Sequence, residues 1–120
     1  MSFLIVRVEL AGKKVSGLGV EIMDRAANQS SGKTFNISTD VVVLAAGGLS
    51  MASPHPEGGC RMGESAQSSV VKSDHQVHGW EKLFVSDSSV FPSSSSLDPG
   101  LSIMVFSYIA AKRIKERFAV

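Results

Sequence analysis

The sequence has few of the residues that define several protein classes. It contains one cysteine in 120 residues, so it can form neither an internal disulfide nor a multi-cysteine zinc site. Its charges nearly balance, with 12 basic and 11 acidic residues, so it lacks the strong positive field that attracts nucleic acid. A chain of this length has room for one compact domain. Composition therefore indicates no nucleic-acid partner and excludes two complete domains.

Long apolar runs are also lacking. The one extended apolar stretch, residues 101–111, is well short of the roughly 20 residues that a bilayer requires, and two cations follow it. The apolar run in residues 1–7 is too short for a secretion signal. We therefore expect no membrane span and a cytoplasmic chain.

The first third of the chain has the alternation typical of antiparallel strands. Residues 3–10 and 15–23 are separated by a short turn with a glycine, which predicts a hairpin. After a polar loop over residues 26–32, residues 33–38 alternate again and predict a third strand.

The next segment has a different pattern. Residues 41–46 are continuously apolar, which predicts a strand buried on both faces inside a parallel sheet. Gly47 and Gly48 end this run, where a ligand could approach the backbone, although a plain turn explains the pair equally well. Residues 83–85 predict a second short buried strand, which ends just before Asp87.

The end of the chain carries the signals of one long helix. Asp98 is a good N-cap and Pro99 suits the first helical position. Cations fill the last turns, where they complement the helix dipole. A helix over residues 99–118 would be about 30 Å long. The apolar residues at helical spacing are Leu101, Met104, Val105, Tyr108, Ala111 and Ile114.

The loop region over residues 50–74 contains an unusual cluster at residues 55–63. His55 has an ordinary pKa of about 6.5, which suits an imidazole for accepting a proton from a substrate at neutral pH. A histidine that faces water explains the local pattern as well. His55 and Cys60 together are too few ligands for a metal site, and we expect Cys60 to be a packing residue.

Four motifs occur in order in the second half of the chain. They are His-Pro-Glu-Gly-Gly-Cys-Arg-Met-Gly at 55–63, Val-His-Gly at 77–79, Asp-Ser-Ser-Val-Phe-Pro at 87–92 and Asp-Pro-Gly-Leu-Ser-Ile at 98–103. In sequence and spacing, this series resembles the carboxyl-terminal signature of the glucose-methanol-choline (GMC) family of flavin-dependent oxidoreductases. Residues 42–48 are similar, more loosely, to a strand end of the same family.

The resemblance implies an α/β fold: a partial FAD/NAD(P)-binding-type domain with an antiparallel three-stranded meander, buried parallel strands and a long C-terminal helix. We expect one incomplete domain, with the meander and buried strand at 1–48, the loop region at 49–82, and the last strand, Ser/Pro loop and helix at 83–120. The resemblance also implies FAD as cofactor and an alcohol, sugar or sterol-like CH–OH donor as a small-molecule partner.

The resemblance also assigns roles to individual residues. His55 matches the family's catalytic histidine, and Asp98 stands where the second catalytic residue is usually Asn or His. Asp87 resembles an acidic residue that approaches the ribityl and pyrophosphate region. The helix start would face the pyrimidine edge of the flavin ring with its N–H groups. The implied cofactor contacts are Gly47, Gly48, Asp87, Ser88, Pro99, Gly100 and Leu101.

Two family features are missing from this sequence. The run Gly17-Leu18-Gly19 lacks the third glycine of a dinucleotide-binding turn, and only residues 49–54 stand where the family has a substrate domain. We therefore expect a fragment or an internal deletion, with an exposed apolar patch along residues 41–46 that favours self-association or binding of a missing segment. The contrasting hypothesis is a non-catalytic protein-binding module. We expect His78 to be structural and His75 to face solvent.

Overall fold

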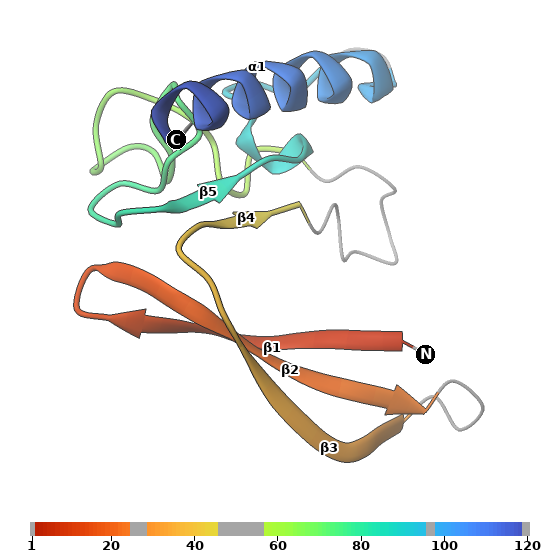
Figure 1. The fold of residues 1–120 in the computed structure, drawn as a ribbon. Helices are drawn as coiled ribbons and strands as arrows, with labels where there is room; N and C mark the ends of the chain where they lie inside the picture. Colours follow the sequence, from red (N-terminus) through yellow and green to blue (C-terminus); the bar gives the residue numbers. More distant parts are fainter. Residues whose placement is uncertain (1, 25–28, 46–56, 96–97, 119–120) are drawn as a thin grey trace. The chain divides into compact units, whose positions relative to one another are not determined.

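The computed structural model describes residues 2–24, 29–45, 57–95 and 98–118, and it combines five strands with one carboxyl-terminal helix in this part of the chain (Figure 1). The chain divides into two compact units. Residues 1–42 with 80–82 are here called the meander unit, and residues 43–79 with 83–120 the motif unit. In chain order, the elements are β1 (Ser2–Ala11), β2 (Lys14–Asp24), β3 (Gln29–Ser38), β4 (Val42–Leu44), β5 (Leu83–Val85), the 3₁₀ turn η1 (Ser88–Val90) and α1 (Gly100–Phe118).

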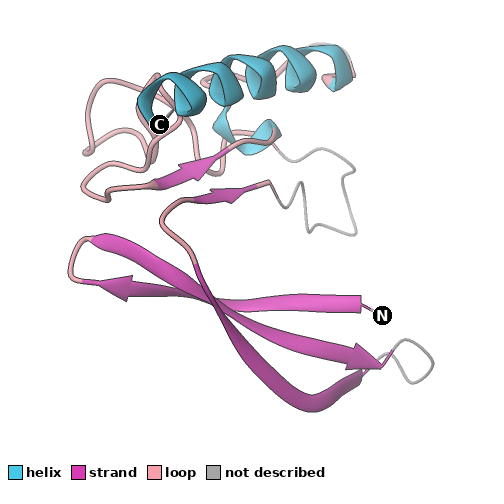
Figure 2. Cartoon of the chain, viewed as in Figure 1, coloured by secondary structure: helices cyan, strands magenta, loops and turns pink. Residues whose placement is uncertain are grey.

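The meander unit contains the predicted antiparallel sheet, in the order β1-β2-β3 (Figure 2). Leu18 on the middle strand lies opposite Val8 on one side and Ile37 on the other. Gly12 turns the first hairpin with a φ of 63°, a backbone conformation that glycine adopts without strain. The hairpin and the third strand are confirmed.

The third strand begins earlier than its alternation predicts. β3 starts at Gln29, and Ser30 pairs with Met23 of β2, so residues 29–32 belong to the sheet and not to a loop. A hydrogen bond from the Ser30 hydroxyl to the Glu21 carboxylate supports this pairing. Cross-strand contacts thus extend a strand into a polar segment that local propensity assigns to a loop.

β4 and β5 form a parallel pair. The Val42 N–H donates to the Lys82 carbonyl at 2.9 Å, and the Ser86 N–H donates to the Leu44 carbonyl at 2.8 Å, so the partners advance together along both strands. The predicted parallel pairing is confirmed. The predicted burial on both faces is wrong, because Val42 is buried but Val43 is 43% exposed. Among the described residues, β4 has a neighbour on one edge alone.

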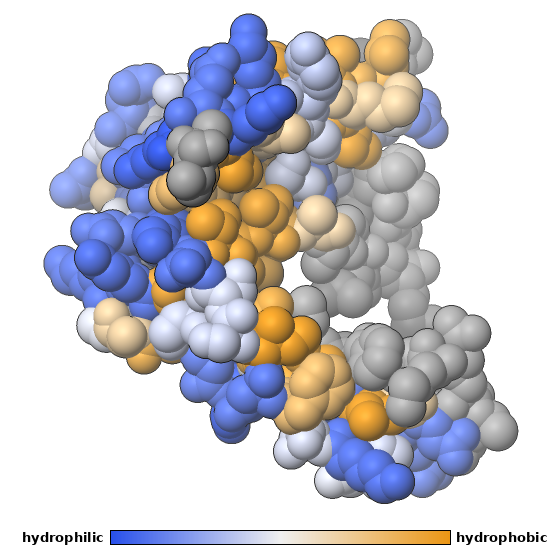
Figure 3. Space-filling model, viewed as in Figure 1, coloured by the Kyte–Doolittle hydropathy of each residue, from blue (hydrophilic) through white to orange (hydrophobic). Residues whose placement is uncertain are grey.

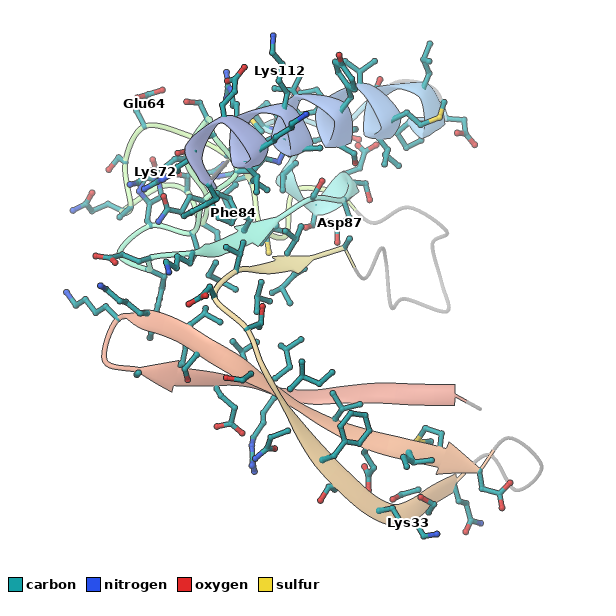
Figure 4. The ribbon with its side chains drawn as sticks, in the orientation of Figure 1. Lys33, Glu64, Lys72, Phe84, Asp87 and Lys112 are labelled. Carbon is teal, nitrogen blue, oxygen red and sulfur yellow. The ribbon has the colours of Figure 1, made fainter. Side chains whose placement is uncertain are left out.

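The motif unit holds the larger core. Val71, Val85, Val90 and Phe91 are each at most 4% exposed and pack in one cluster. Phe84 lies on β5 (Figure 4). Its ring contacts that of Phe118 of α1 edge to face, with ring centroids 6.1 Å apart. Partly buried apolar side chains complete the cluster: Leu44, Cys60, Met62, Val77, Ile103 and Phe106.

α1 begins as its capping sequence predicts. The Gly100 N–H donates to an oxygen of Asp98 at 2.9 Å, and the Ile103 N–H donates to the Pro99 carbonyl at 2.8 Å. Asp98 is therefore the N-cap, and the helix ends at Phe118 as expected. Among the described residues, no helix has the length and apolar character needed to cross a membrane.

The packed face of α1 is not the run of apolar residues that stands out in the sequence. Ile103, Phe106 and Ala110 face the core. The other apolar stripe, which we call the outer stripe, is exposed, and its exposed fractions range from 49% to 73%. Figure 3 shows apolar surface near the start of α1 and hydrophilic surface toward its end. The outer stripe consists of Leu101, Met104, Val105 and Tyr108.

Candidate functional site

Two motifs that lie far apart in the sequence are hydrogen-bonded to each other in the motif unit. The Cys60 N–H donates to the Ser89 carbonyl and the Met62 N–H donates to the Val90 carbonyl, each at 2.9 Å. Cys60 and Met62 also pack against the buried cluster. The second half of the His-Pro motif is thus fixed along η1, and the expectation that Cys60 packs is confirmed.

Gly58 shows why this motif contains glycine. Its φ is 79°, in the left-handed region that L side chains rarely adopt, and its carbonyl accepts from the Arg61 N–H at 3.3 Å to close a turn. Gly63 is needed for space, because a Cβ there would lie 3.0 Å from the Cβ of Ser69. Both glycines allow the loop to double back toward η1.

A second tie joins this loop to the segment that leads into α1. Both carboxylate oxygens of Glu57 accept from Ser95, one from its N–H at 2.7 Å and the other from its hydroxyl at 2.5 Å. Both residues are half-buried. The two residues are 38 positions apart, so this contact closes a long loop.

Asp87 lies just after β5 and caps η1 (Figure 4). One carboxylate oxygen accepts from the Ser89 N–H at 2.9 Å and from the Ser89 hydroxyl at 2.5 Å. Ser88 is buried, with 2% of its surface exposed. Asp87 therefore stabilises the start of η1, a structural role that its motif does not reveal.

The residues at the start of α1 differ in exposure. Asp98 is exposed and Pro99 is buried, whereas Gly100 is half-buried and Leu101 is 71% exposed. The first turn of α1 holds no acidic residue. This end of the helix combines positive dipole potential with little side-chain bulk at Gly100.

His75 is the residue whose environment differs most from the sequence-based expectation. It is 1% exposed rather than solvent-facing, and its φ is 68°. Its Nδ1 lies 3.0 Å from the Val85 carbonyl, and because a carbonyl can only accept, Nδ1 carries the proton. The ring meets Phe106 of α1 edge to face at 6.1 Å. Histidine closes a turn there and fills the core, so the solvent-facing prediction is wrong.

Burial lowers the pKa of His75 below its ordinary value, and the positive charge of Arg113 acts in the same direction. The hydrogen bond to Val85 and the charge of Asp74 oppose this shift more weakly. His75 is therefore neutral in the folded chain at pH 7, as its buried position requires.

His78 is structural, as expected. Its Nε2 lies 3.1 Å from the Gly63 carbonyl and 3.0 Å from the Ser69 hydroxyl oxygen. The Ser69 hydroxyl donates to the Ser65 carbonyl at 2.6 Å, so it accepts from the histidine. His78 thus holds the loop that comes after the His-Pro motif.

Two arginines fix the other end of α1 to the loop around His75. Arg113 donates to the Ser73 carbonyl. Arg117 donates to the side chain of Gln76 at 2.5 Å and pairs with Asp74 at 3.3 Å. The helix is therefore held near its end by these arginines, whereas Asp98 caps its start.

Three predicted site residues lie outside the described residues: His55, Gly47 and Gly48. Their roles stay predictions. Within the described part of the chain, no three His, Cys, Asp or Glu side chains are placed to hold a metal ion.

Most of the chain matches a known protein family. The model of the GMC oxidoreductase family matches residues 7–107, which is most of the chain. The chain belongs to the GMC oxidoreductase family. The match includes the start of α1, and also the loop and η1, which hydrogen bonds join in this GMC chain.

Curated relatives of the GMC chain are named as oxidoreductases. It is 33% identical over 63 residues to the long-chain-alcohol oxidase FAO3 of Arabidopsis thaliana, covering 52% of this chain and 8% of that protein. It is 43% identical over 61 residues to the dehydrogenase str4 of Strobilurus tenacellus, covering 51% of this chain and 10% of that protein. The match thus spans about a tenth of the length of these relatives or less.

Among solved structures, the GMC chain is similar to pyridoxine 4-oxidase from Mesorbium loti. The TM-score is 0.48 at 26% sequence identity, and the match covers 52% of this chain and 12% of that chain.

Sequence reasoning missed two residues of this GMC chain that hold the loops together. Glu57 stands at a variable position of the His-Pro motif, so the motif gave no signal for it. His75 stands next to Gln76, which is also buried. No local sequence pattern distinguishes a buried histidine in a turn from an exposed one.

Proposed function

We propose that this segment contributes the catalytic loop and the flavin-facing helix end of an FAD-dependent oxidoreductase. The donor would be the CH–OH group of an alcohol, sugar or sterol-like molecule, and the fold a partial FAD/NAD(P)-binding-type domain. One observation supports this most: the described parts of three family motifs, at residues 57–63, 87–92 and 98–103, meet in one unit through hydrogen bonds and core packing. The names of the curated relatives favour an alcohol donor.

The start of α1 fits one part of FAD better than another. The Asp98 carboxylate already accepts from Gly100, and a second negative charge at that place would be repelled. A phosphate therefore fits poorly, whereas the electron-rich but uncharged edge of an oxidised flavin ring fits the N–H groups and the dipole of the first turn. This fit supports the assignment of Pro99, Gly100 and Leu101 to the ring edge.

The remaining cofactor contacts are assigned by family likeness. Asp87 and Ser88 lie at the end of β5, where the ribityl chain or pyrophosphate would run. Gly47 and Gly48 would provide a close backbone approach. A cytoplasmic location also stays a prediction.

His55 would accept the proton of the substrate hydroxyl, and a general base of this kind typically raises the rate by roughly 10²–10⁴. FAD, when bound, supplies the acceptor for the hydride that leaves the carbon bearing that hydroxyl. Asp98 stands at the second catalytic position, where a carboxylate cannot donate the hydrogen bond that Asn or His would give to the developing alkoxide. We infer that Asp98 acts mainly as a helix cap in this chain.

The experiment that tests the role of His55 uses a GMC oxidoreductase carrying this segment. His55→Ala should lower alcohol-dependent flavin reduction by on the order of 10²-fold or more, because the hydroxyl proton loses its acceptor. His78→Ala is the matched control, since it removes a histidine that holds a loop. An unchanged rate for His55→Ala would remove His55 from the catalytic role.

For the chain by itself, we propose no catalysis, because the phosphate-binding glycine turn and the substrate domain of the family have no counterpart in its sequence. Absorbance of the purified chain with added FAD tests this. Alcohol-dependent bleaching of the flavin band would contradict it, whereas an unbleached band would support it.

The outer stripe of α1 favours a second candidate function, a protein-binding module. Leu101 and Tyr108 are 71% and 73% exposed, and together with Met104 and Val105 they form one exposed apolar stripe, which marks an interaction surface. Beside α1, an apolar groove of about 340 Å³ includes Val43 and Ile114 in its lining. Such a module would associate with itself or with another polypeptide.

Light scattering after size exclusion tests self-association. Tyr108→Lys and Leu101→Lys should convert an associating chain into a monomer, and Lys33→Glu on β3 is the control. A parent chain that is monomeric at high concentration and binds no apolar dye would contradict the second function.

A further inference from the structure

The outer stripe of α1 follows a seven-residue repeat. Val105 and Lys112 are seven residues apart, and Leu101, Tyr108 and Lys115 follow one another at the same interval. This spacing is typical of a helix face that packs along a second helix. The residues of α1 that face the core of the motif unit lie on the opposite side of the helix. The face with the repeat is therefore the exposed one.

A hollow of about 340 Å³ lies on this exposed face, where the outer stripe ends. The residues that line it are Tyr108, Ala111, Lys112 and Lys115, and Lys112 points away from β5 (Figure 4). Counted along the helix, they stand at positions i, i+3, i+4 and i+7, which are the positions of a hole that receives one side chain of a facing helix. At the other end of the stripe, Leu101 is 71% exposed and provides such a side chain.

The charges on this face determine the direction of the facing helix. Asp98 stands three residues before Leu101, and Lys115 stands three residues after Lys112. One oxygen of Asp98 accepts from Gly100, whereas in the described part of the chain the Lys115 ammonium group has no ion pair. A second α1 running in the same direction would place like charges opposite each other. A second α1 running in the opposite direction, with Leu101 over Lys112, would place Asp98 opposite Lys115.

We propose that the outer stripe pairs with that of a second copy of this chain, in antiparallel orientation. Leu101 of each copy fills the hollow of the other, Asp98 of each lies beside Lys115 of the other, and Val105 meets Tyr108 at the centre. The proposal deepens the second candidate function and rests on it. The contact includes one helix face, which is less than a stable complex buries, so we expect a dimer that dissociates on dilution. Asp98 and Leu101 are also proposed site residues, so the tests use the chain without FAD.

Charge exchange in the full 120-residue chain tests the pairing. Lys115→Glu should raise the dissociation constant of the dimer by roughly 3–10-fold, because both symmetry-related ion pairs become repulsive. Asp98→Lys should weaken the dimer for the same reason. An equimolar mixture of the two variants should regain the affinity of the parent, because opposite charges face each other again. Sedimentation velocity over a range of concentrations measures the constant, and Lys33→Glu on β3 is the control that should leave it unchanged.

Asp98→Lys also removes the cap of α1, so a distance measurement that keeps Asp98 provides an independent test. Glu116→Cys, at a side chain that is 63% exposed, carries a spin label in a Cys60→Ser background. In the antiparallel pair the two labels should be about 30 Å apart along the helices, at 1.5 Å per residue. In a parallel pair they would lie within about 20 Å of each other. Tyr108→Lys should abolish the distance signal.

The possible failures are distinguishable. A dimer with the short label distance, or one whose affinity Lys115→Glu leaves unchanged, would overturn the antiparallel pairing while the protein-binding function stands. A monomeric chain that binds an apolar dye would overturn the pairing with a second copy and leave another polypeptide as the partner. A monomeric chain that binds no dye would contradict the second candidate function as well.

Discussion

The meander unit and the motif unit achieve order in opposite ways. The meander unit has three strands of 10 or 11 residues in antiparallel pairing, yet all residues of β3 are exposed. The motif unit has strands of three residues and long irregular loops, yet it holds the cluster of Val71, Val85, Val90 and Phe91. Val15 and Val20 of β2 are buried in the meander unit, but most of the buried apolar residues in the described part of the chain lie in the motif unit, where strands are short.

This difference shows what the motif residues do. A loop without regular pairing must satisfy its backbone groups one by one, and in the motif unit side chains do this. Asp87 caps η1, Glu57 binds Ser95 and His78 binds the Gly63 carbonyl. Asp87, a proposed cofactor contact, therefore also has a structural role, and Glu57 and His78 hold the neighbouring loops.

The largest expected effect is a loss of stability when a core residue of the motif unit is truncated. Phe91→Ala should lower the free energy of unfolding by about 3–5 kcal/mol, because it removes a ring that is 4% exposed and leaves a cavity. Phe35→Ala on β3 is the matched control: that ring is 40% exposed, and its loss should cost less than about 1 kcal/mol. Urea unfolding of both variants measures the difference, and equal losses would show that burial is not concentrated in the motif unit.

The next effect concerns the buried histidine. His75→Asn should cost about 1–2 kcal/mol at pH 7, because asparagine tolerates the positive φ but loses the ring contact with Phe106. The pKa of His75 is lowered in the folded chain, so unfolding takes up a proton below the ordinary value of about 6.5. The stability that the parent gains from neutral His75 is complete above that pH and is lost as the pH falls below it.

The difference in stability between the parent and His75→Asn should therefore shrink between pH 7 and pH 5. Urea unfolding at several pH values measures it. A difference that stays constant over this range would contradict a buried, neutral His75.

An effect of similar size separates two neighbouring glycines of the His-Pro motif. Gly58→Ala should cost about 1–2 kcal/mol, because its φ of 79° strains an L residue. Gly59→Ala should be nearly neutral, since its Cβ would meet nothing closer than the Ser89 side chain at 3.9 Å. Thermal unfolding compares them, and a tolerated Gly58→Ala would mean that the loop does not turn at that residue.

The smallest effect is expected in the meander unit. Lys82 and Asp40 are paired at 3.5 Å, but the Asp40 side chain is 93% exposed, so solvent screens the pair. Asp40→Asn should shift the midpoint of urea unfolding by no more than the scatter between repeats. A clear loss of stability would mean that charge pairs contribute to the meander unit more than its exposure indicates.

What could be predicted from the sequence depends on whether the signal is local. Alternation and a glycine turn predicted the β1–β2 hairpin, and Asp98 with Pro99 predicted the start of α1, because these signals act over a few residues. The packed face of α1 escaped prediction: Phe106 contacts Phe91 and His75, which are distant in the sequence. The Glu57–Ser95 tie escaped for the same reason.

The central claim is that the motif loop, η1 and the start of α1 form one flavin-facing surface. An amide NMR titration of the full chain with FAD, at concentrations high enough to detect weak binding, tests it most directly. We predict that the signals that move belong to residues 58–63, 87–89 and 100–101. Signals that move along β1–β3 instead, or no movement at all, would contradict it.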